Sequence, residues 1–575
     1  MLIFLTILPL LTFSFTLDFS EGPYGSEYFD IAGPIILDDL NALPQGDINQ
    51  DNILNIQDLI IMIQFVIGNM DSIEEDADVN FDGIVDILDI VISINLILEG
   101  YDPAWDFETE WNGQDSYIFV NYTAASGALL ASNTKDLLLE NSPMNVHYLF
   151  ISDRTTYQND ILNLKDDFEQ ILSTMSEDLQ SHWKKHLHFI PEKTSFLNNW
   201  LEEALQGEDA IAIDRFQRIR ETGYFGNPAS FTGTFIHYLA HEALYFNYEF
   251  DNIYEPNSDY DEISIFEREF YTGGWAASIS KSVILPTNEQ LSDYSGLSVE
   301  LLRGCPNASM NYSDAGCDDY DRKAYLFICD ADETNCFEIA RWVTPFDRQP
   351  HHLTDISPFI SALRPGGEKV FKFQEDGWPN SLLTLRLRLY RDENNTSSTP
   401  YEMIPIWNGT VQFNPDYANN RPPTSFSVPE NATKVEFVSY ITGHGWGDNT
   451  CYNCCEFCNS KHIFTTNGGT FDFNIDFPNA SSNNYCMSAE AIANGTIPNQ
   501  YGTWGYGRAG WCPGQNIKPF ITDITNHVIL GDENIIDYDA CRVSGNSCVT
   551  APGCGTCGYC PEIAFSSYII IYLEN

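Results

Sequence analysis

The stretch CYNCCEFC, Cys451–Cys458, sets the character of the C-terminal half of this 575-residue chain. It places Glu456 between closely spaced cysteines, shortly after the run YITGHGWG at Tyr440–Gly447. A disulfide between Cys454 and Cys458 would clamp the backbone around that carboxylate. Acid–base and electrostatic catalysis need a catalytic group held in such a fixed geometry.

The sequence around this stretch has the pattern of an all-β protein. From about residue 256 onward, short apolar runs such as KAYLFICD and LLTLRLRLYR are separated by turn residues, and a second set of such runs begins near Pro422. Many short strands with turn signals predict β-sandwiches. We therefore expect one sandwich over 256–418 and another over 422–575, with NNRPPT (Asn419–Thr424) as the seam between them.

All fifteen cysteines lie at or after Cys305, so an oxidised C-terminal half follows a cysteine-free N-terminal half. The odd number leaves one thiol unpaired or bonded to another chain. The tail cysteines have a spacing that suits zinc, but a secreted setting favours disulfides: Cys541, Cys548, Cys554, Cys557 and Cys560. The sequence does not pair Cys451 or Cys455.

Five motifs of the β half resemble the peptide-N-glycosidase F family, whose members are amidases that remove whole N-glycans from asparagine. The matching pieces are long and occur in the family's order: CPN…CDDYDR (Cys305–Arg322), RWVTPF (Arg341–Phe346), GWG, C-x-E-x-C and GRAGWCPG. The resemblance implies two adjacent jelly-roll sandwiches with an active site in the cleft between them. It implies no cofactor for catalysis.

The resemblance also assigns roles to individual residues. The principal catalytic acid falls on Asp321 and the second on Glu456, while the third falls on Glu375 in FKFQEDGW, where an extra residue before Trp378 leaves Asp376 as the alternative. Paired carboxylates of different pKa can divide the activation of water from the protonation of the leaving nitrogen.

The substrate-binding residues follow in the same way. Arg322 and Arg508 fall on substrate-contacting and sugar-binding positions, and Trp446 and Trp378 have rings that can stack on pyranoses. The alternative for each acid or arginine is a solvated surface charge, and for each tryptophan a place in the core.

The same motifs imply the disulfides Cys486–Cys512, Cys454–Cys458 and Cys305–Cys317. We add Cys329–Cys336, because the strands around ADETN have the pattern of a hairpin.

An internal repeat occupies the N-terminal region, with one copy at Gly46–Gly68 and another at Ala77–Gly100. Each copy opens with alternating oxygen-bearing side chains and continues as an apolar helix, which is the pattern of a Ca²⁺ loop. The predicted ligands are Asp47, Asn49, Asp51, the Ile53 carbonyl, Asn55 and Asp58 in the first loop, and Asp78, Asn80, Asp82, the Ile84 carbonyl, Asp86 and Asp89 in the second.

Asp in the last position and a single helix per loop resemble dockerin, the module that binds cohesin domains. We therefore expect a small all-α, Ca²⁺-binding module over 44–100. Ile56, Gln57, Ile87 and Leu88 stand where dockerins face their partner, so a cohesin-like protein is a possible partner. The alternatives are packing against the chain's own next domain, or an acidic helical hairpin that binds no metal.

Residues 101–255 predict an α/β domain with a parallel sheet. The strands are expected at Asn145–Ser152, Lys185–Pro191 and Asp209–Asp214, and the helices at Tyr157–Leu179 and Ser195–Leu205. Two histidine groups lie here: His182, His186 and His188, and His237 and His241 with Glu242. Neither forms HExxH, so ordinary core or surface histidines are the favoured interpretation.

Charge and the N-terminus indicate a secreted protein. The chain has 28 basic and 82 acidic residues, a net charge of −54, and this field repels nucleic acid and anionic membranes. Residues 1–17 read as a signal peptide and 18–43 as a linker, and no later stretch is apolar enough to span a membrane. The whole chain is thus expected to be extracellular and multidomain, with two jelly-roll sandwiches preceded by the α/β domain and the dockerin-like module.

Three functions compete. The first is a hydrolase that cleaves the amide between the innermost GlcNAc and the asparagine of N-glycoproteins or glycopeptides. The second is a non-catalytic glycan-binding or scaffold protein displayed through the dockerin-like module. The third, a copper monooxygenase of a related fold, is disfavoured because the β half contains no His-x-His pair.

Overall fold

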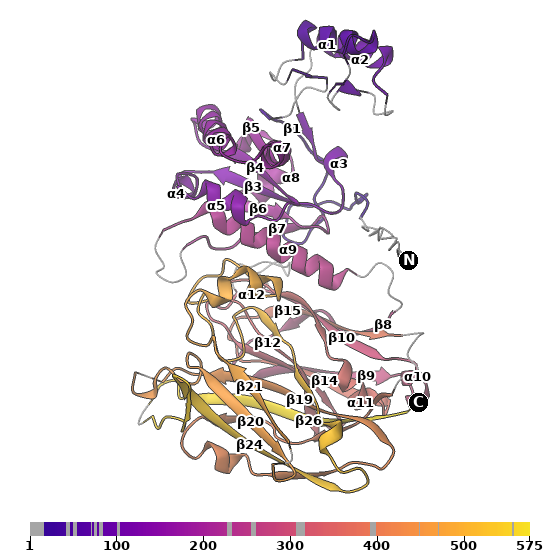
Figure 1. Ribbon diagram of the computed structural model, residues 1–575, viewed down its shortest axis with the longest axis vertical. Coiled ribbons are helices and arrows are strands. Elements are labelled where there is room, and N and C mark those ends of the chain that lie inside the picture. Colours follow the sequence, from indigo (N-terminus) through magenta and orange to yellow (C-terminus); the bar gives the residue numbers. More distant parts are fainter. Residues whose placement is uncertain are drawn as a thin grey trace, which may run out of the picture. The chain divides into compact units, whose positions relative to one another are not determined.

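The computed structural model describes residues 17–41, 46–49, 54–70, 72–73, 77–79, 84–99, 104–226, 233–254, 260–305, 317–391, 398–447, 449–469, 471–554 and 557–574. The protein is mainly β and contains several sheets (Figure 1). It divides into two compact units, one formed by 1–222 and 235–243 and the other by 223–234 and 244–575. Helix α9 (Leu239–Ile253) belongs to both. Among the helices of the described residues, none is long and apolar enough to cross a membrane.

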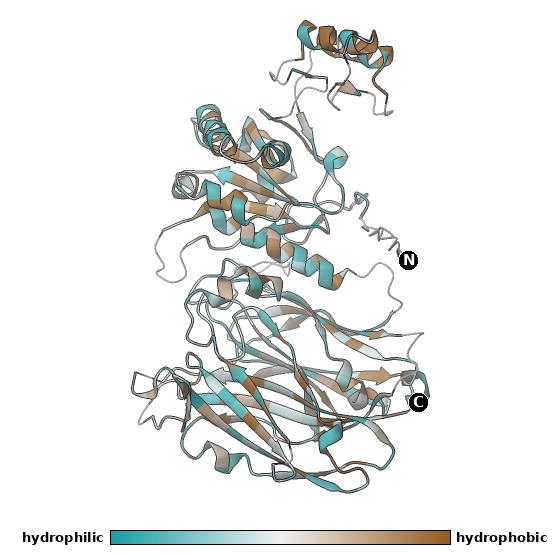
Figure 2. Cartoon of the chain, viewed as in Figure 1, coloured by the Kyte–Doolittle hydropathy of each residue, from teal (hydrophilic) through white to brown (hydrophobic). Residues whose placement is uncertain are grey.

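Two helices follow the predicted calcium loops, α1 (Ile56–Val66) and α2 (Ile87–Glu99). Both are strongly hydrophobic along their length (Figure 2). Asn55 begins α1 as its N-cap, because its side chain accepts a hydrogen bond from the Gln57 N–H at 2.7 Å.

The last predicted ligand of each loop is buried and binds the loop's own backbone. Asp58 accepts N–H groups from Ile48 at 3.0 Å, Asn49 at 3.2 Å and Asn55 at 2.9 Å. Asp89 accepts them in the same way from Val79 at 2.9 Å and Asp86 at 2.7 Å. The predicted ligands Asp51, Ile53, Asn80 and Asp82 lie outside the described residues.

A five-stranded sheet of order β5-β4-β3-β6-β7 forms the α/β domain. Its strands are β3 (Ser116–Tyr122), β4 (Val146–Ser152), β5 (Leu187–Lys193), β6 (Ala210–Ile213) and β7 (Ile219–Glu221). Strands β4 and β5 were predicted and are parallel, and β3, which was not predicted, is parallel to β4. Strand β6 was expected in the same parallel sheet but pairs antiparallel with β3, and β7 pairs antiparallel with β6. The apolar run at β6 is buried on both faces, and such a run does not reveal the direction of its strand.

The predicted helices of this domain are divided. One helix was expected over Tyr157–Leu179, but α6 (Tyr157–Leu172) ends there and α7 (Glu177–His186) begins after a break. In the break, the Ser173 and Thr174 hydroxyls donate to carbonyl oxygens of the last turn of α6, which competes with helix continuation. The helix expected over Ser195–Leu205 is a 3₁₀ turn at Thr194–Phe196 followed by α8 (Trp200–Ala204).

We predicted a linker over 18–43, but the described residues 17–41 belong to the α/β domain. Strand β1 (Ile36–Asp38) pairs with β2 (Ala104–Asp106), and Ala32 and Leu37 are buried in the same core cluster as the sheet. The segment shows no helical or strand periodicity in its sequence, because it contacts the sheet mostly through isolated backbone hydrogen bonds. One of these is the Phe29 N–H donating to the Ile219 carbonyl at 2.8 Å.

The first sandwich consists of two antiparallel sheets of order β13-β10-β15-β8 and β22-β12-β11-β14-β9. The strands are β8 (Tyr260–Tyr271), β9 (Ala277–Leu285), β10 (Gly296–Gly304), β11 (Lys323–Cys329), β12 (Cys336–Val343), β13 (His351–Asp355), β14 (Gly367–Glu375), β15 (Ser381–Tyr390) and β22 (Gln515–Ile517). Val299 and Leu385 of one sheet share a core cluster with Leu326 and Phe373 of the other.

The second sandwich has sheets of order β16-β26-β19-β23, with β17 also on β26, and β18-β24-β20-β21, with β25 also on β24. The strands are β16 (Thr399–Pro405), β17 (Thr410–Gln412), β18 (Thr424–Ser427), β19 (Ala432–His444), β20 (Ser460–Thr466), β21 (Phe471–Phe477), β23 (Phe520–Asp523), β24 (Glu533–Ser544), β25 (Ser547–Val549) and β26 (Glu562–Leu573). Phe437 and Phe565 meet Phe464 and Tyr538 in its core.

The chain passes between the sandwiches three times, so the predicted seam at Asn419–Thr424 does not separate them. Strands β16 and β17 precede that seam but pair with β26 of the second sandwich. Strand β22 follows the seam but pairs with β12 of the first sandwich. A three-residue strand carries too short a pattern for its sheet to be read from the sequence.

The four predicted disulfides are present: Cys305–Cys317, Cys329–Cys336, Cys454–Cys458 and Cys486–Cys512. Three more join Cys451 to Cys554, Cys541 to Cys548 and Cys557 to Cys560. The remaining thiol, Cys455, is buried. The tail cysteines are thus paired as disulfides.

Glu300 anchors a buried charge network in the first sandwich, and its loss is expected to be costly. Its carboxylate lies 2.9 Å from His351 Nε2 and 2.8 Å from Arg388 Nη2. Glu300→Gln leaves the arginine without its anionic partner and is expected to lower the free energy of unfolding by about 3–5 kcal/mol. Denaturant unfolding measures this loss. Glu262→Gln on exposed β8 should change stability by no more than about 0.5 kcal/mol, and equal losses in both variants would contradict the prediction.

Candidate active site

Glu456 lies in the cysteine-rich loop that follows β19. Its backbone N–H donates to the Gly445 carbonyl at 3.0 Å, and its carbonyl accepts from the Ala509 N–H at 2.9 Å. The disulfide Cys454–Cys458 brackets it, and Cys451–Cys554 ties the same loop to the tail. The backbone of Glu456 is therefore held from both sides.

The GRAGWCPG loop supplies a buried arginine next to this carboxylate. The Nη1 of Arg508 donates to the carbonyl oxygens of Thr503, Trp504 and Tyr506 at 2.9, 3.3 and 2.6 Å, and its Nη2 donates to the Thr503 hydroxyl at 3.1 Å. The guanidinium also lies over the Trp511 ring, 5.1 Å from its centroid. Arg508 is buried. Its immediate partners are protein groups, so the structure does not present it as an open sugar-binding side chain.

Asp321 comes from the first sandwich, just before β11. The segment that carries it is fixed on both sides, because the Asp318 carbonyl accepts from the Asp347 N–H at 3.0 Å and the Arg322 N–H donates to Thr344 Oγ1 at 2.8 Å. The Asp321 carboxylate is largely buried, with 16% of its side chain exposed.

Arg508 brings the two predicted acids together. Its Nη2 lies 3.4 Å from Asp321 Oδ2, and its Nε lies 3.6 Å from Glu456 Oε1. The two carboxylates come from different sandwiches and share one guanidinium. Because they also lie in a largely buried place, their protonation is strongly coupled.

Burial and mutual repulsion favour a proton on this pair. Burial, together with the negative charge of Asp321, raises the pKa of Glu456 to about 8, and the positive charge of Arg508 opposes this. Burial also raises the pKa of Asp321, while Arg508 and Arg322 counteract it. One carboxyl of the pair therefore keeps a proton at neutral pH, as a general acid requires.

Several aromatic side chains and one arginine of the same unit lie at or near the surface. Arg322 is held by Asp318, whose carboxylate accepts from its Nε at 2.8 Å, and its guanidinium lies 5.2 Å from the Tyr320 ring centroid. Trp446 is partly exposed and stacks on Tyr559, with ring centroids 4.5 Å apart. Trp378 is 67% exposed. These rings are open to a ligand.

Glu375, the third predicted acid, is bonded to a buried arginine rather than to the other two acids. Its two carboxylate oxygens accept hydrogen bonds from Arg303 Nε at 2.8 Å and Nη2 at 2.6 Å, and both side chains are buried. The alternative residue, Asp376, lies 3.7 Å from Lys323 Nζ, and burial raises its pKa. Among the described residues, neither carboxylate forms a hydrogen bond or an ion pair with Asp321 or Glu456.

Four residues of the site were missed in the sequence. Asp318 orients Arg322, Arg303 neutralises Glu375, Thr503 binds Arg508, and Tyr559 stacks on Trp446. Asp318 lies inside the motif CDDYDR, Thr503 lies shortly before GRAGWCPG, and Tyr559 lies between Cys557 and Cys560. That proximity was the available signal. Arg303 had none, because its partner is 72 residues away.

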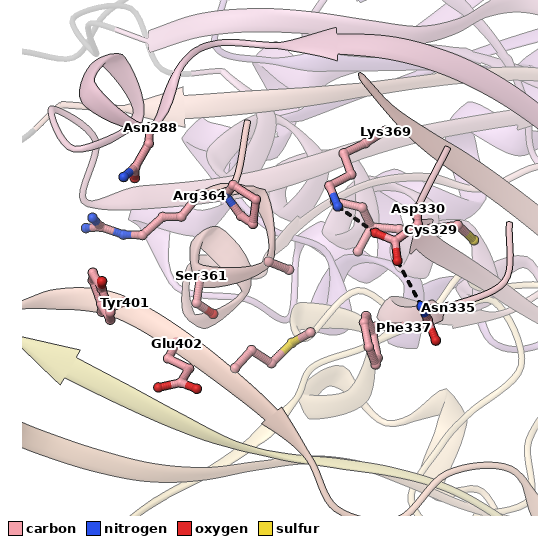
Figure 3. A pocket seen from close by; sticks show the side chains of 14 residues that line it. Asn288, Cys329, Asp330, Asn335, Phe337, Ser361, Arg364, Lys369, Tyr401 and Glu402 are labelled. Atoms are coloured by element: carbon pink, nitrogen blue, oxygen red, sulfur yellow. Dashed lines mark hydrogen bonds and ion pairs between the residues drawn. The ribbon is translucent and has the colours of Figure 1, made fainter. Parts of the chain in front are cut away.

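Two pockets of the structure are lined by residues other than the acid pair. A pocket of about 430 Å³ is formed by β11, β12, β14, α11 (Ile360–Leu363) and β16, and Asp330 within it bonds both Lys369 and Asn335 (Figure 3). A second pocket, of about 310 Å³, is lined by Lys323, Asp376 and residues of β17 and β26. Neither is lined by Asp321, Glu456 or Arg508.

Comparison with known proteins gives matches to part of the chain. Residues 412–553 match the family described as "Peptide-N-glycosidase F, C terminal", a segment that contains Glu456 and Arg508 but not Asp321. The chain is also 24% identical over 254 residues to peptide-N(4)-(N-acetyl-beta-D-glucosaminyl)asparagine amidase F of Elizabethkingia miricola. That match covers 41% of this chain and 64% of the relative, so it spans just under two thirds of the relative's length.

Solved structures give a similar result. A recombinant peptide:N-glycanase F matches with 18% identity and a TM-score of 0.42, covering 55% of this chain and 96% of that one. PNGase F, a glycosylasparaginase from Flavobacterium meningosepticum, matches with 20% identity and a TM-score of 0.41, covering 55% of this chain and 97% of that one.

The raised pKa of Glu456 predicts how the stability of the protein depends on pH. Its folded value of about 8 lies above the ordinary 4.5, so the folded protein binds the extra proton and loses stability as pH rises from about 4.5 to about 8. Glu456→Gln avoids the buried negative charge. The variant should therefore match wild type near pH 4.5 and be more stable above pH 8, by on the order of a few kcal/mol.

Thermal unfolding across this pH range measures the difference. Glu430→Gln, at an exposed position, is the matched control and should follow wild type throughout. Parallel curves for wild type and Glu456→Gln would show that Glu456 ionises without the burial penalty.

Proposed function

We propose that this protein is a secreted hydrolase of N-glycoproteins. In this proposal it cleaves the amide between the innermost GlcNAc and asparagine, in the manner that the name of its amidase relative describes. The proposal includes a jelly-roll topology for each of the two sandwiches. The observation that carries it is the pair of carboxylates, Asp321 and Glu456, that meet across one buried guanidinium.

The coupled pair suits both halves of an amide hydrolysis. Water must lose a proton as its oxygen bonds to the asparagine side-chain carbonyl carbon, and the leaving nitrogen must gain one as the C–N bond breaks. In the proposed mechanism Asp321 handles the proton transfers at the scissile amide, while Glu456 holds water and substrate beside it. Arg508 stabilises the negative charge that the pair carries after ionisation.

The surface around the pair suits a carbohydrate. The exposed rings of Trp378, Trp446, Tyr320 and Tyr559 offer apolar faces for stacking, and Arg322 offers donors for sugar hydroxyls. We propose that these residues bind the substrate. Arg508 then acts on the acids themselves, because its own donors already serve protein oxygens.

Glu375 gives a specific reason to keep the non-catalytic alternative. A carboxylate bonded twice to a buried arginine is poorly placed to position water. If catalysis in this fold needs a third acid, then Asp376 must supply it, or the chain binds N-glycans without cleaving them.

The N-terminal repeat is proposed to bind structural Ca²⁺ and to dock the enzyme to another protein. Asp47, Asp58 and Asp89 are buried, and buried carboxylates are stabilised by a cation. The helices that follow expose apolar side chains, including Ile56 at 67%, Ile87 at 65% and Leu88 at 55%. Such a face suits a cohesin-like protein partner. The disulfides support an extracellular location.

Asp321→Asn should abolish measurable glycan release, because it removes the proposed proton-transfer group while keeping its shape. The expected loss is at least about 10²–10⁴-fold in rate. The assay measures release from a denatured N-glycoprotein and from an N-glycopeptide. Binding of the glycopeptide to the variant should persist.

Asp319→Asn is the matched control, because Asp319 is an exposed neighbour in the same motif. It should retain wild-type activity. Full activity in Asp321→Asn would refute its catalytic role, and a wild-type protein that binds the glycopeptide without cleaving it would favour the scaffold alternative.

The calcium proposal predicts that the excised segment 44–100 gains helix on adding Ca²⁺, since its carboxylates repel one another without the ion. Circular dichroism with Ca²⁺ and with a chelator measures the gain. A double variant, Asp58→Asn with Asp89→Asn, should lose the response. Equal helix content with and without Ca²⁺ in the unmodified segment would rule out metal-dependent folding.

A further inference from the structure

A second cluster of titratable side chains lies in the α/β domain, at the amino ends of its three parallel strands. Asp115 precedes β3, His147 is the second residue of β4, and His188 lies on β5. His186 ends α7, and Asp39 follows β1. Residues from widely separated parts of the chain thus converge, and the catalytic proposal uses none of them.

Four of these residues form a continuous chain of contacts. Asp39 Oδ2 lies 2.8 Å from His188 Nδ1, His188 Nε2 lies 3.0 Å from His147 Nδ1, and His147 Nε2 lies 3.2 Å from Asp115 Oδ2. Asp39, His188, His147 and Asp115 are all buried. Each of the three contacts is favourable only if a proton or a metal cation lies between its two heteroatoms.

With both imidazoles neutral, the three contacts share only two protons. Two neutral imidazoles carry one N–H each, so they fill two of the three contacts. In the tautomers that leave His147 Nε2 free to bind a cation, His188 Nδ1 donates to Asp39 and His147 Nδ1 donates to His188 Nε2. The lone pair of His147 Nε2 then faces a carboxylate oxygen of Asp115 with no proton between them.

His186 adds a third lone pair at the same place. Its Nδ1 lies 2.8 Å from the backbone carbonyl of His182, so Nδ1 carries the proton and Nε2 does not. The His186 and His147 rings lie close, with centroids 4.2 Å apart. The ligand atoms of Asp115, His147 and His186 all lie within 4.8 Å of one another.

We propose that Asp115, His147 and His186 bind one divalent transition-metal ion of the zinc class. A metal ion between His147 Nε2 and Asp115 supplies the missing positive charge, after which every contact of the chain is satisfied. Two imidazoles and one carboxylate are ordinary zinc ligands, and a three-residue set leaves one position open to water or a further ligand.

The distances suit such an ion. Zinc bonds to nitrogen and oxygen of about 2.0–2.2 Å place tetrahedral ligand atoms about 3.3–3.5 Å apart, and the 3.2 Å between His147 and Asp115 is close to that. His186 is half-buried at the end of α7, so its ring can close the remaining distance by a small inward movement. The partial exposure of His186 also keeps the site accessible to solvent.

The surrounding groups have the pattern of a metal site. A ligating histidine usually donates its other N–H to a carboxylate, a carbonyl or a further polar group, which fixes its tautomer. His186 donates to the His182 carbonyl, and His147 donates to His188, which Asp39 orients in turn.

The structure changes the interpretation of the histidines. In the sequence, His182, His186 and His188 form an incomplete ligand set, and ordinary histidines were the favoured interpretation. The parallel pairing of β3 with β4 and of β4 with β5 adds Asp115 and His147, which lie far away in the sequence. His182 contributes its backbone carbonyl.

Cobalt binding to the full-length protein tests the proposal. The protein is stripped of metal with a chelator, dialysed, given excess CaCl₂ to occupy the N-terminal loops, and titrated with CoCl₂. Wild type should show saturable visible absorption typical of low-coordinate Co²⁺ at about one ion per chain, and ZnCl₂ should displace it. Asp115→Asn and His186→Gln should lose this absorption.

His237→Gln is the matched control, a histidine of the same unit outside the cluster. It should bind Co²⁺ as wild type does, and ZnCl₂ should raise its melting temperature equally. Because His186 is half-buried at a helix end, its variant remains informative even if Asp115→Asn fails to fold. The proposal is overturned if wild type shows no saturable absorption, or if folded His186→Gln binds Co²⁺ like wild type.

Discussion

The candidate active site depends on one buried guanidinium. Arg508 donates to three carbonyl oxygens of its own loop and faces a carboxylate from each sandwich. Without it, two acids in a place that excludes most water would repel each other, and both would take up protons. With it, one acid can ionise while the other stays protonated. The loop that carries Arg508 continues directly into β22, which pairs with β12 of the first sandwich. The backbone connection between the sandwiches and the electrostatic connection between the acids therefore belong to the same segment.

A second buried pair supports the first. The Arg303–Glu375 pair lies beside Gly377, where an added side chain would meet Glu375 Oε1 at 2.8 Å and Asp318 Oδ2 at 3.4 Å. Asp318 in turn holds Arg322, the residue that follows Asp321. The glycine thus allows two ion pairs to pack closely beneath the acid-bearing segment. Breaking the Arg303–Glu375 pair would leave an uncompensated buried charge beneath that segment.

The sequence predicted those parts of the site that lie inside long motifs. Asp321, Glu456 and Arg508 were named from CDDYDR, C-x-E-x-C and GRAGWCPG, and the structure brings these three together. The sequence could not predict pairings that depend on strand register between distant segments. The three-residue β22, the antiparallel β6 and the contact of His147 with Asp115 all depend on such register. Residues 17–41 were missed for a related reason, because backbone bonds made singly to a sheet leave no repeat in the sequence.

The distribution of charge explains why these arginines matter. Only 28 basic residues accompany 82 acidic ones. Five of the basic residues lie in or near the acid-bearing segments and the strands beneath them: Arg303, Arg322, Lys323, Arg341 and Arg508. The negative field of the remaining protein raises the free energy of any further carboxylate that ionises. A site that needs one ionised acid in such a field requires cations within a few ångströms, since distant ones are screened by solvent and salt. Burying the guanidinium of Arg508 against both acids meets this requirement, and it does so where salt cannot weaken the interaction.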